Sequence, residues 1–270
     1  MYERILVPVD GSTFSEEVLP YARTVARAAG AKLTLLRVTE HDSEQDEATR
    51  ELQSLAQGLQ AEVRTVVGRG NVAASILEEA ARVPGTLVAM TTHGRSGIAE
   101  AILGSVAHDV VRTGRDPVLV YRPKGRSSQV SHDPVEINTV MLPIDGSGHS
   151  EWMEQQAGEW ARLLKARLLV VQVISPEARP DPGVPPNDAL ESSYVRSHAI
   201  ELGKRYGVEA NWEVLRGDPV DAMARFIDDR RDILVVMATR GRAGLQAAVL
   251  GSVTAGLLRE GNVPIVVRMP

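Results

Sequence analysis

The sequence predicts an α/β protein made of two repeated domains, each with a five-stranded, mostly parallel sheet and helices on both faces. The first observation is an internal repeat: residues 4–38 align with 139–173 without a gap and with 12 identities in 35 positions. Residues 94–123 likewise align with 241–270, with 13 identities in 30. The second observation is that short apolar segments alternate with amphipathic ones in each repeat, as in parallel sheets with right-handed crossovers.

The spacing between the repeats predicts the domain boundaries. The offset is 135 residues at the start of the repeats and 147 at the end, so the second copy carries 12 extra residues. Five prolines crowd residues 175–187, which predicts a surface loop there. Residues Lys124–Pro134 have the Ser, Gly, Lys and Pro content of a linker, so we expect a linker at 125–135 and domains at 1–124 and 136–270.

The elements of the first repeat follow from local patterns. Residues 4–10 form an almost continuous apolar run, typical of a strand covered on both faces. Apolar residues at helical spacing predict a helix over Phe14–Ala29, with Thr13-x-x-Glu16 resembling a capping box. The same reasoning predicts strands at 32–38, 63–67, 87–91 and 118–121, and helices at 49–58, 72–82 and 105–112. The second repeat follows the same plan.

Composition excludes several classes of protein. The 270 residues are 43% hydrophobic and 24% charged, as in a globular protein rather than a disordered one. Cysteine is absent, so disulfides and thiol nucleophiles are excluded, and the six histidines lack metal-ligand spacing. The net charge of −5 argues against nucleic-acid binding, and no segment suggests a membrane span or a signal peptide. We therefore expect a cytoplasmic protein.

The first candidate site is the end of the first strand of each repeat. The two segments are Pro8-Val9-Asp10-Gly11-Ser12 and Pro143-Ile144-Asp145-Gly146-Ser147. Ligands of parallel sheets bind outside the carboxyl ends of the strands, where an aspartate can accept hydrogen bonds from a sugar or a base. The alternative is that Asp10 and Ser12 only cap the next helix and Gly11 permits the turn.

The second candidate site is a glycine loop after the fourth strand of each repeat. In the first repeat it contains Gly94, Arg95 and Gly97, followed by Gly104-Ser105-Val106. Its counterparts in the second repeat are Gly241, Arg242, Gly244 and Gly251-Ser252-Val253. Glycines let backbone amides approach a phosphate, and the helix that opens at the serine favours an anion. The alternative is an ordinary tight turn with a serine cap.

These motifs resemble those of the universal stress protein family, and the resemblance covers residues 3–123 and 136–270. It implies a tandem member with the adenine nucleotide alpha hydrolase-like fold. In the family's nucleotide-binding members, which have the pattern Gly-x2-Gly-x9-Gly-Ser/Thr, the aspartate after the first strand faces ribose and adenine. The end of the second strand, here Val38 and Val173, meets adenine, and the glycine loop and serine hold the phosphates.

The chain departs from the family pattern at its first glycine. Thr91 stands there in the first repeat and Ala238 in the second, whereas the later glycines match. Both replacements are small, and the β-branched side chain of Thr91 makes the first repeat the weaker candidate. Scarce aromatic residues imply that adenine would rest on aliphatic side chains rather than between rings.

The resulting hypothesis is a cytoplasmic stress-response protein that binds ATP, with or without Mg²⁺, in one or both repeats, with the nucleotide as a regulatory ligand. We identify no catalytic residues and no protein metal site, so ATP hydrolysis would be slow at most. The alternatives are an interaction scaffold without nucleotide and a slow ATP hydrolase or phosphotransferase. Strands 118–121 and 265–267 are expected to pair in an intramolecular pseudo-dimer, and a homodimer is left open.

Overall fold

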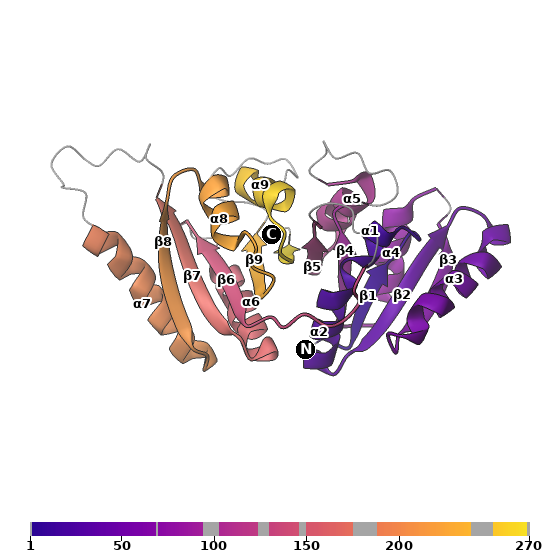
Figure 1. Cartoon of the computed structure of the whole chain (residues 1–270), viewed down its shortest axis with the longest axis horizontal. Helices are drawn as coiled ribbons and strands as arrows, with labels where there is room; N and C mark the ends of the chain where they lie inside the picture. Colours follow the sequence, from indigo (N-terminus) through magenta and orange to yellow (C-terminus); the bar gives the residue numbers. More distant parts are fainter. Residues whose placement is uncertain are drawn as a thin grey trace. The chain divides into compact units, whose positions relative to one another are not determined.

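The computed structural model describes residues 2–68, 70–93, 103–123, 130–145, 150–174, 188–238 and 251–268 (Figure 1). Contacts divide the chain into two compact units. Unit 1 comprises residues 1–136 together with 264–269, and unit 2 comprises residues 137–263 with 270. Several predicted features lie outside the described residues: Gly94, Arg95, Gly97, Gly146, Ser147, Gly241, Arg242, Gly244 and the proline-rich segment 175–187.

Unit 1 contains five parallel strands in the order β3-β2-β1-β4-β5. Their bounds are β1 (Arg4–Pro8), β2 (Lys32–Thr39), β3 (Glu62–Val67), β4 (Thr86–Thr91) and β5 (Val118–Tyr121). β1 lies between β2 and β4, with Arg4 opposite both Lys32 and Thr86. Every residue of β4 and β5 is buried, which agrees with the apolar runs that predicted strands covered on both faces.

Helices cover both faces of this sheet. They are α1 (Thr13–Glu16), α2 (Leu19–Ala29), the short 3-10 helix η1 (Asp42–Glu44), α3 (Gln45–Gln57), α4 (Val72–Ala81) and α5 (Ser105–Thr113). α2 packs on β1 and β2, and α3 packs on β2 and β3, whereas α4 packs on β2, β4 and α5 (Figure 1). Right-handed crossovers place α2 and α3 on one face and α4 and α5 on the other, because the strand order reverses after β3.

The prediction of one helix over 14–29 is wrong. The chain forms α1 and α2, separated at Glu17–Val18, because Pro20 has no N–H to continue the hydrogen bonds of α1 and instead occupies the first turn of α2. The predicted capping box at Thr13 is wrong as well, since Ser12 is the N-cap and its Oγ accepts from the Ser15 N–H at 3.2 Å. In unit 2, where Gln155 stands at the position of Pro20, α6 is unbroken.

Unit 2 repeats the plan of unit 1, with strands in the order β9-β6-β7-β8. Its elements are β6 (Thr139–Ile144), α6 (Ser150–Leu164), β7 (Arg167–Ile174), α7 (Asp188–Tyr206), β8 (Ala210–Arg216), α8 (Pro219–Ile227), β9 (Ile233–Ala238) and α9 (Ser252–Glu260). Matching backbone hydrogen bonds establish the equivalence: Glu3 N–H donates to Gly85 O, and Asn138 N–H donates to Asp232 O. The two units can therefore be compared position by position.

The last strand of the chain, β10 (Ile265–Arg268), groups with unit 1. It lies antiparallel beside β5, with Ile265 opposite Val120 and Val267 opposite Val118. The predicted pairing of 118–121 with 265–267 is thus confirmed. Residues on both strands are buried, so the contact closes an edge of the unit 1 sheet that would otherwise expose unpaired backbone groups.

The described part of the predicted linker, residues 130–135, contacts the helices of unit 1. The Arg23 guanidinium donates to the His132 carbonyl, and the Thr24 hydroxyl donates to the Val135 carbonyl. The His132 ring also lies 3.1 Å from the Glu16 carboxylate, measured from Nε2 to Oε2. This segment is therefore held against α1 and α2.

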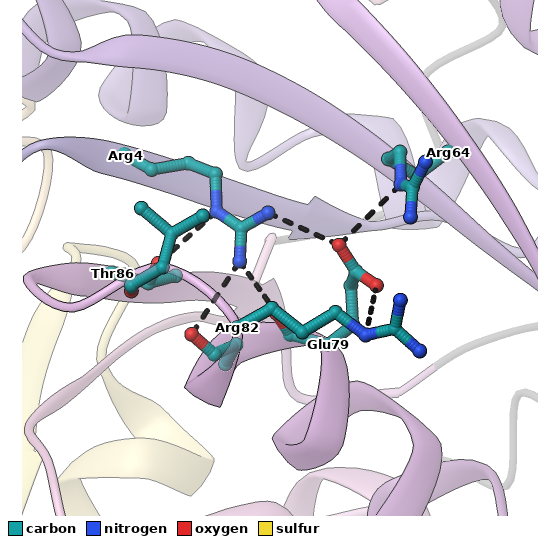
Figure 2. A network of polar contacts seen from close by, with 7 residues as sticks. Arg4, Arg64, Glu79, Arg82 and Thr86 are labelled. Atoms are coloured by element: carbon teal, nitrogen blue, oxygen red, sulfur yellow. Dashed lines mark hydrogen bonds and ion pairs between the residues drawn. The ribbon is translucent and has the colours of Figure 1, made fainter.

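A cluster of charges lies at the amino-terminal edge of the unit 1 sheet, where β1 and β4 begin. We call Arg4, Arg64, Glu79, Arg82 and Thr86 the Glu79 cluster (Figure 2). The Glu79 carboxylate is only 2% exposed and contacts three guanidinium groups: Arg4 at 3.1 Å, Arg82 at 3.2 Å and Arg64 at 3.5 Å. Arg4 also donates to Thr86 Oγ1 at 3.0 Å and to the Glu79 carbonyl, so the cluster ties β1 and β4 to the end of α4.

We expect Glu79→Ala to destabilise unit 1 by about 3–5 kcal/mol, because it leaves the buried Arg4 guanidinium without its counter-ion. The control Lys32→Ala should change stability by less than about 1 kcal/mol, because the Lys32–Glu62 pair is exposed. Circular dichroism follows the urea unfolding of the whole chain. Tryptophan fluorescence follows the unfolding of unit 2 alone, because all three tryptophans lie in that unit, at positions 152, 160 and 212. Equal stability of the Glu79→Ala and Lys32→Ala variants would contradict the expectation.

Candidate functional site

The carboxyl end of β1 continues into a tight turn that places Asp10 beside the sheet. The Val9 N–H donates to Leu36 O at 2.9 Å, which prolongs the pairing with β2 by one residue. Asp10 Oδ1 accepts from the Ser12 N–H at 3.0 Å and from its hydroxyl at 2.6 Å, and Gly11 has φ +82°. The capping interpretation of Ser12 and the turn interpretation of Gly11 are therefore confirmed.

The beginning of α5 is joined to the end of β4. The Gly104 N–H donates to Thr92 O at 2.8 Å, and a Cβ added at Gly104 would lie 3.3 Å from that same oxygen. Gly104 is the N-cap of α5 and offers no side chain to the first amides of the helix. At the N-terminus of α4, by contrast, the Asn71 side chain accepts from the Ala74 N–H at 2.9 Å. The amides that open α5 are thus left for another acceptor.

A cavity of about 320 Å³ lies between these two strand ends. Six predicted site residues line it together: Pro8, Asp10, Val38, Gly104, Ser105 and Val106. The remaining lining residues are Val9, Ser15, Leu36, Val72, Ile76, Met90, Thr91, Thr92, His93 and Ala107. The structure therefore brings the end of the first strand and the Gly104-Ser105-Val106 part of the second motif to one cavity, at the switch point of the strand order.

One wall of the cavity is apolar, and the sequence analysis missed it. Val72 and Ile76 come from α4, while Leu36 and Met90 come from β2 and β4. Val72 is 38% exposed. The helical pattern over 72–82 was visible in the sequence, but only the position of α4 over β2 and β4 shows that its first turns face a cavity.

The position of Val38 in this wall is fixed by a glycine. The Gly68 N–H donates to Thr39 O at 2.8 Å, and a Cβ added at Gly68 would come within 2.4 Å of Val38 Cγ1. A side chain at position 68 would therefore clash with Val38.

The buried Thr91 stands at the first glycine position of the motif, and its hydroxyl donates to His93 O at 2.8 Å. The hydroxyl is thus used inside the turn. His93 also lines the cavity, with its Nδ1 3.0 Å from Thr92 Oγ1 and its ring edge-on to Phe14 at 6.4 Å. The described lining contains no Phe, Tyr or Trp ring.

The end of β1 is also supported from the opposite face of the sheet. The buried Arg37 donates to Val9 O at 3.3 Å and forms an ion pair with Glu51 at 2.8 Å. Glu51 belongs to α3. This pair holds the peptide immediately before Asp10.

The predicted site residues of unit 2 lie on the elements equivalent to those of unit 1. Pro143 lies in β6 and Asp145 follows it, Val173 lies in β7, and Gly251 is the N-cap of α9 before Ser252 and Val253. The end of β9 is joined to α9 by the Thr254 hydroxyl, which donates to Ala238 O at 2.7 Å. The loops at 146–149 and 239–250, which would complete the site, lie outside the described residues.

The described residues offer neither a candidate metal site nor a membrane-spanning helix. No group of three or more His, Asp or Glu side chains among them could hold a metal ion. None of the helices in that part of the chain is long and apolar enough to cross a membrane.

Comparison with known proteins identifies relatives of each repeat and of the whole chain. The sequence profile of the Universal stress protein family matches residues 1–122 and 136–268. A universal stress protein of Mycobacterium bovis is 31% identical over 191 residues, which span 67% of this chain and 61% of that protein. One of Mycolicibacterium smegmatis is 24% identical over 98% of this chain and 97% of its own length.

Solved structures show the same fold over the full length. A protein described as functionally unknown from Pseudomonas aeruginosa has a TM-score of 0.70 and 17% identity, covering 100% of this chain and 93% of its own. A universal stress protein from Archaeoglobus fulgidus has a TM-score of 0.66 and 19% identity, covering 98% and 96%. Together with the two profile matches, these findings show that the chain belongs to the universal stress protein family and carries the family's domain twice.

Proposed function

We propose that the cavity of unit 1 binds ATP and that the nucleotide regulates this stress protein. The observation that carries the proposal is the glycine N-cap of α5, whose amides open on a cavity with an apolar wall. An anionic group would accept from the amides near Ser105 and Val106, while adenine would lie against Val38, Val72 and Ile76. Asp10 would face the ribose hydroxyls.

The proposal extends to unit 2, because Asp145, Val173, Gly251 and Ser252 occupy equivalent positions. Gly94, Arg95, Gly97 and their counterparts Gly241, Arg242 and Gly244 would complete the phosphate loops. Mg²⁺ would accompany the phosphates of the nucleotide. We further propose a cytoplasmic location and a pseudo-dimer built on the β5–β10 pairing, with each repeat acting as one domain.

Regulation is favoured over catalysis by the chemistry of the lining. Asp10 is the one carboxylate among the described residues that line the cavity, and its Oδ1 already accepts two hydrogen bonds from Ser12. That carboxylate shapes the turn, and the described lining residues include no lysine to stabilise a transferring phosphoryl group.

Replacing Gly104 with Asp should abolish ATP binding in unit 1. Aspartate is a favoured N-cap and Gly104 has φ −62°, so the helix should still form. The new carboxylate would accept from the amides and repel the phosphates. Isothermal titration calorimetry on nucleotide-free protein measures the stoichiometry, and Gly251→Asp is the matched variant in unit 2. A Gly104→Asp variant with the stoichiometry and affinity of the unchanged chain would place the ligand elsewhere.

Replacing Asp10 with Asn should remove selectivity for ribose. Asparagine keeps an acceptor oxygen for Ser12 but loses the charge that strengthens a hydrogen bond to a sugar hydroxyl. In the Gly251→Asp background, where only unit 1 can bind, ATP should bind about tenfold more tightly than 2′-deoxy-ATP or 3′-deoxy-ATP. With Asp10→Asn that ratio should fall to about threefold or less. An unchanged ratio for both analogues would mean that Asp10 does not contact the sugar.

A further inference from the structure

We propose that the Glu79 cluster of unit 1 is a binding site for a phosphomonoester dianion, held by Arg64 and Arg82. This site lies at the amino-terminal edge of the sheet, at the starts of β1 and β4, whereas the cavity lies at their carboxyl ends. The proposal does not depend on nucleotide binding.

The first argument is the balance of charge. Arg4, Arg64 and Arg82 contribute three positive charges and Glu79 one negative charge, which leaves a surplus of two. The carboxyl end of α4 adds about half a negative charge, and Arg4 already donates to two carbonyls there. The neighbouring Lys32 and Glu62 neutralise each other at 2.8 Å. Among the described contacts of the cluster, the side chains therefore leave a surplus of two positive charges, or about one and a half once the end of α4 is counted.

The second argument is the geometry of the two outer arginines. Each directs its Nε toward Glu79, Arg64 to Oε1 and Arg82 to Oε2, while their side chains are 49% and 62% exposed. Figure 2 shows Arg4 on one side of the carboxylate, with Arg64 above it and the Arg82 guanidinium below it on the other side. A single buried carboxylate thus contacts two further like charges. Their outer nitrogens remain accessible to an anion that would relieve the repulsion.

The third argument comes from unit 2, which has the same fold without this cluster. Thr139 is equivalent to Arg4, because Thr139 lies opposite Ile233 as Arg4 lies opposite Thr86. Strand register makes Glu213 equivalent to Arg64, and the N-caps Asn71 and Asp218 align α4 with α8. Phe226 and Asp229 then replace Glu79 and Arg82. The charge at these positions changes from +2 to −2, so the fold does not require the arginines.

The chemistry of guanidinium groups selects the ligand class. Arginine forms paired hydrogen bonds to the oxygens of phosphates and carboxylates, and a phosphomonoester carries a charge of about −1.5 to −2 at neutral pH. A dianion matches the surplus of two charges better than a carboxylate does. Such a group is found on small metabolites and on phosphorylated side chains.

The test is a titration of the full chain with inorganic phosphate, in which the Nε–Hε NMR signals of the arginines report binding. We expect the signals of Arg64 and Arg82 to shift with a millimolar dissociation constant, while chloride at equal ionic strength leaves them in place. Arg64→Gln and Arg82→Gln should each weaken binding by about tenfold. A phosphoserine peptide that binds more tightly than phosphate, with no binding of its serine form, would identify a phosphorylated chain as the source. Equal affinity would identify a small phosphomonoester.

Two controls make the outcome decisive. Arg50→Gln removes another exposed arginine, whose Nε donates only to the Asp46 carbonyl, and should leave phosphate binding unchanged. Gly104→Asp removes the proposed nucleotide site and should leave the shifts of Arg64 and Arg82 unchanged. The titration of the unmodified chain decides the question even if a variant fails to fold. The proposal would be overturned if the Arg64 and Arg82 signals did not shift at tens of millimolar phosphate, or if chloride shifted them equally.

Discussion

The candidate site depends on one constraint in unit 1: the chain leaves β1 and β4 toward opposite faces of the sheet. These neighbouring parallel strands both end at the same edge of the sheet, but β1 leads to α2 on one face and β4 leads to α5 on the other. The cavity lies where the two paths separate. Asp10 follows the first strand directly, and Thr92 holds the N-cap of α5 through its carbonyl, so both are positioned by buried strands.

Much of this arrangement could be predicted because its signals are local in the sequence. Strands covered on both faces are continuous apolar runs, and a glycine loop followed by a serine predicts the start of a helix that favours an anion. The interruption between α1 and α2 was missed although Pro20 was visible, because the apolar stripe continues across it. The contribution of Val72 and Ile76 could not be predicted, since in sequence they are indistinguishable from ordinary core residues of a helix.

The Glu79 cluster marks the limit of what a single sequence can reveal. Arg4 and Glu79 are separated by 75 positions, and their contact depends on the strand order that brings β1 beside β4 and beneath α4. Helical spacing from Ile76 places Glu79 rather than Glu78 on the buried face of α4, but no local pattern shows which arginines it contacts. The duplicated chain supplies the comparison that a single domain lacks, because unit 2 shows which positions the fold requires to be charged and which it does not.

One helix, α4, contributes residues to both the cavity and the Glu79 cluster. Its first turns contribute Val72 and Ile76 to the cavity wall, and its last turn contributes Glu79, with Arg82 as the C-cap. A helix of ten residues is about 15 Å long, so about that distance along α4 separates the two sites. Arg4 anchors the last turn of α4 to β1 by binding Glu79 and the final carbonyls of the helix. The buried ion pair therefore stabilises the wall of the cavity from the opposite edge of the sheet.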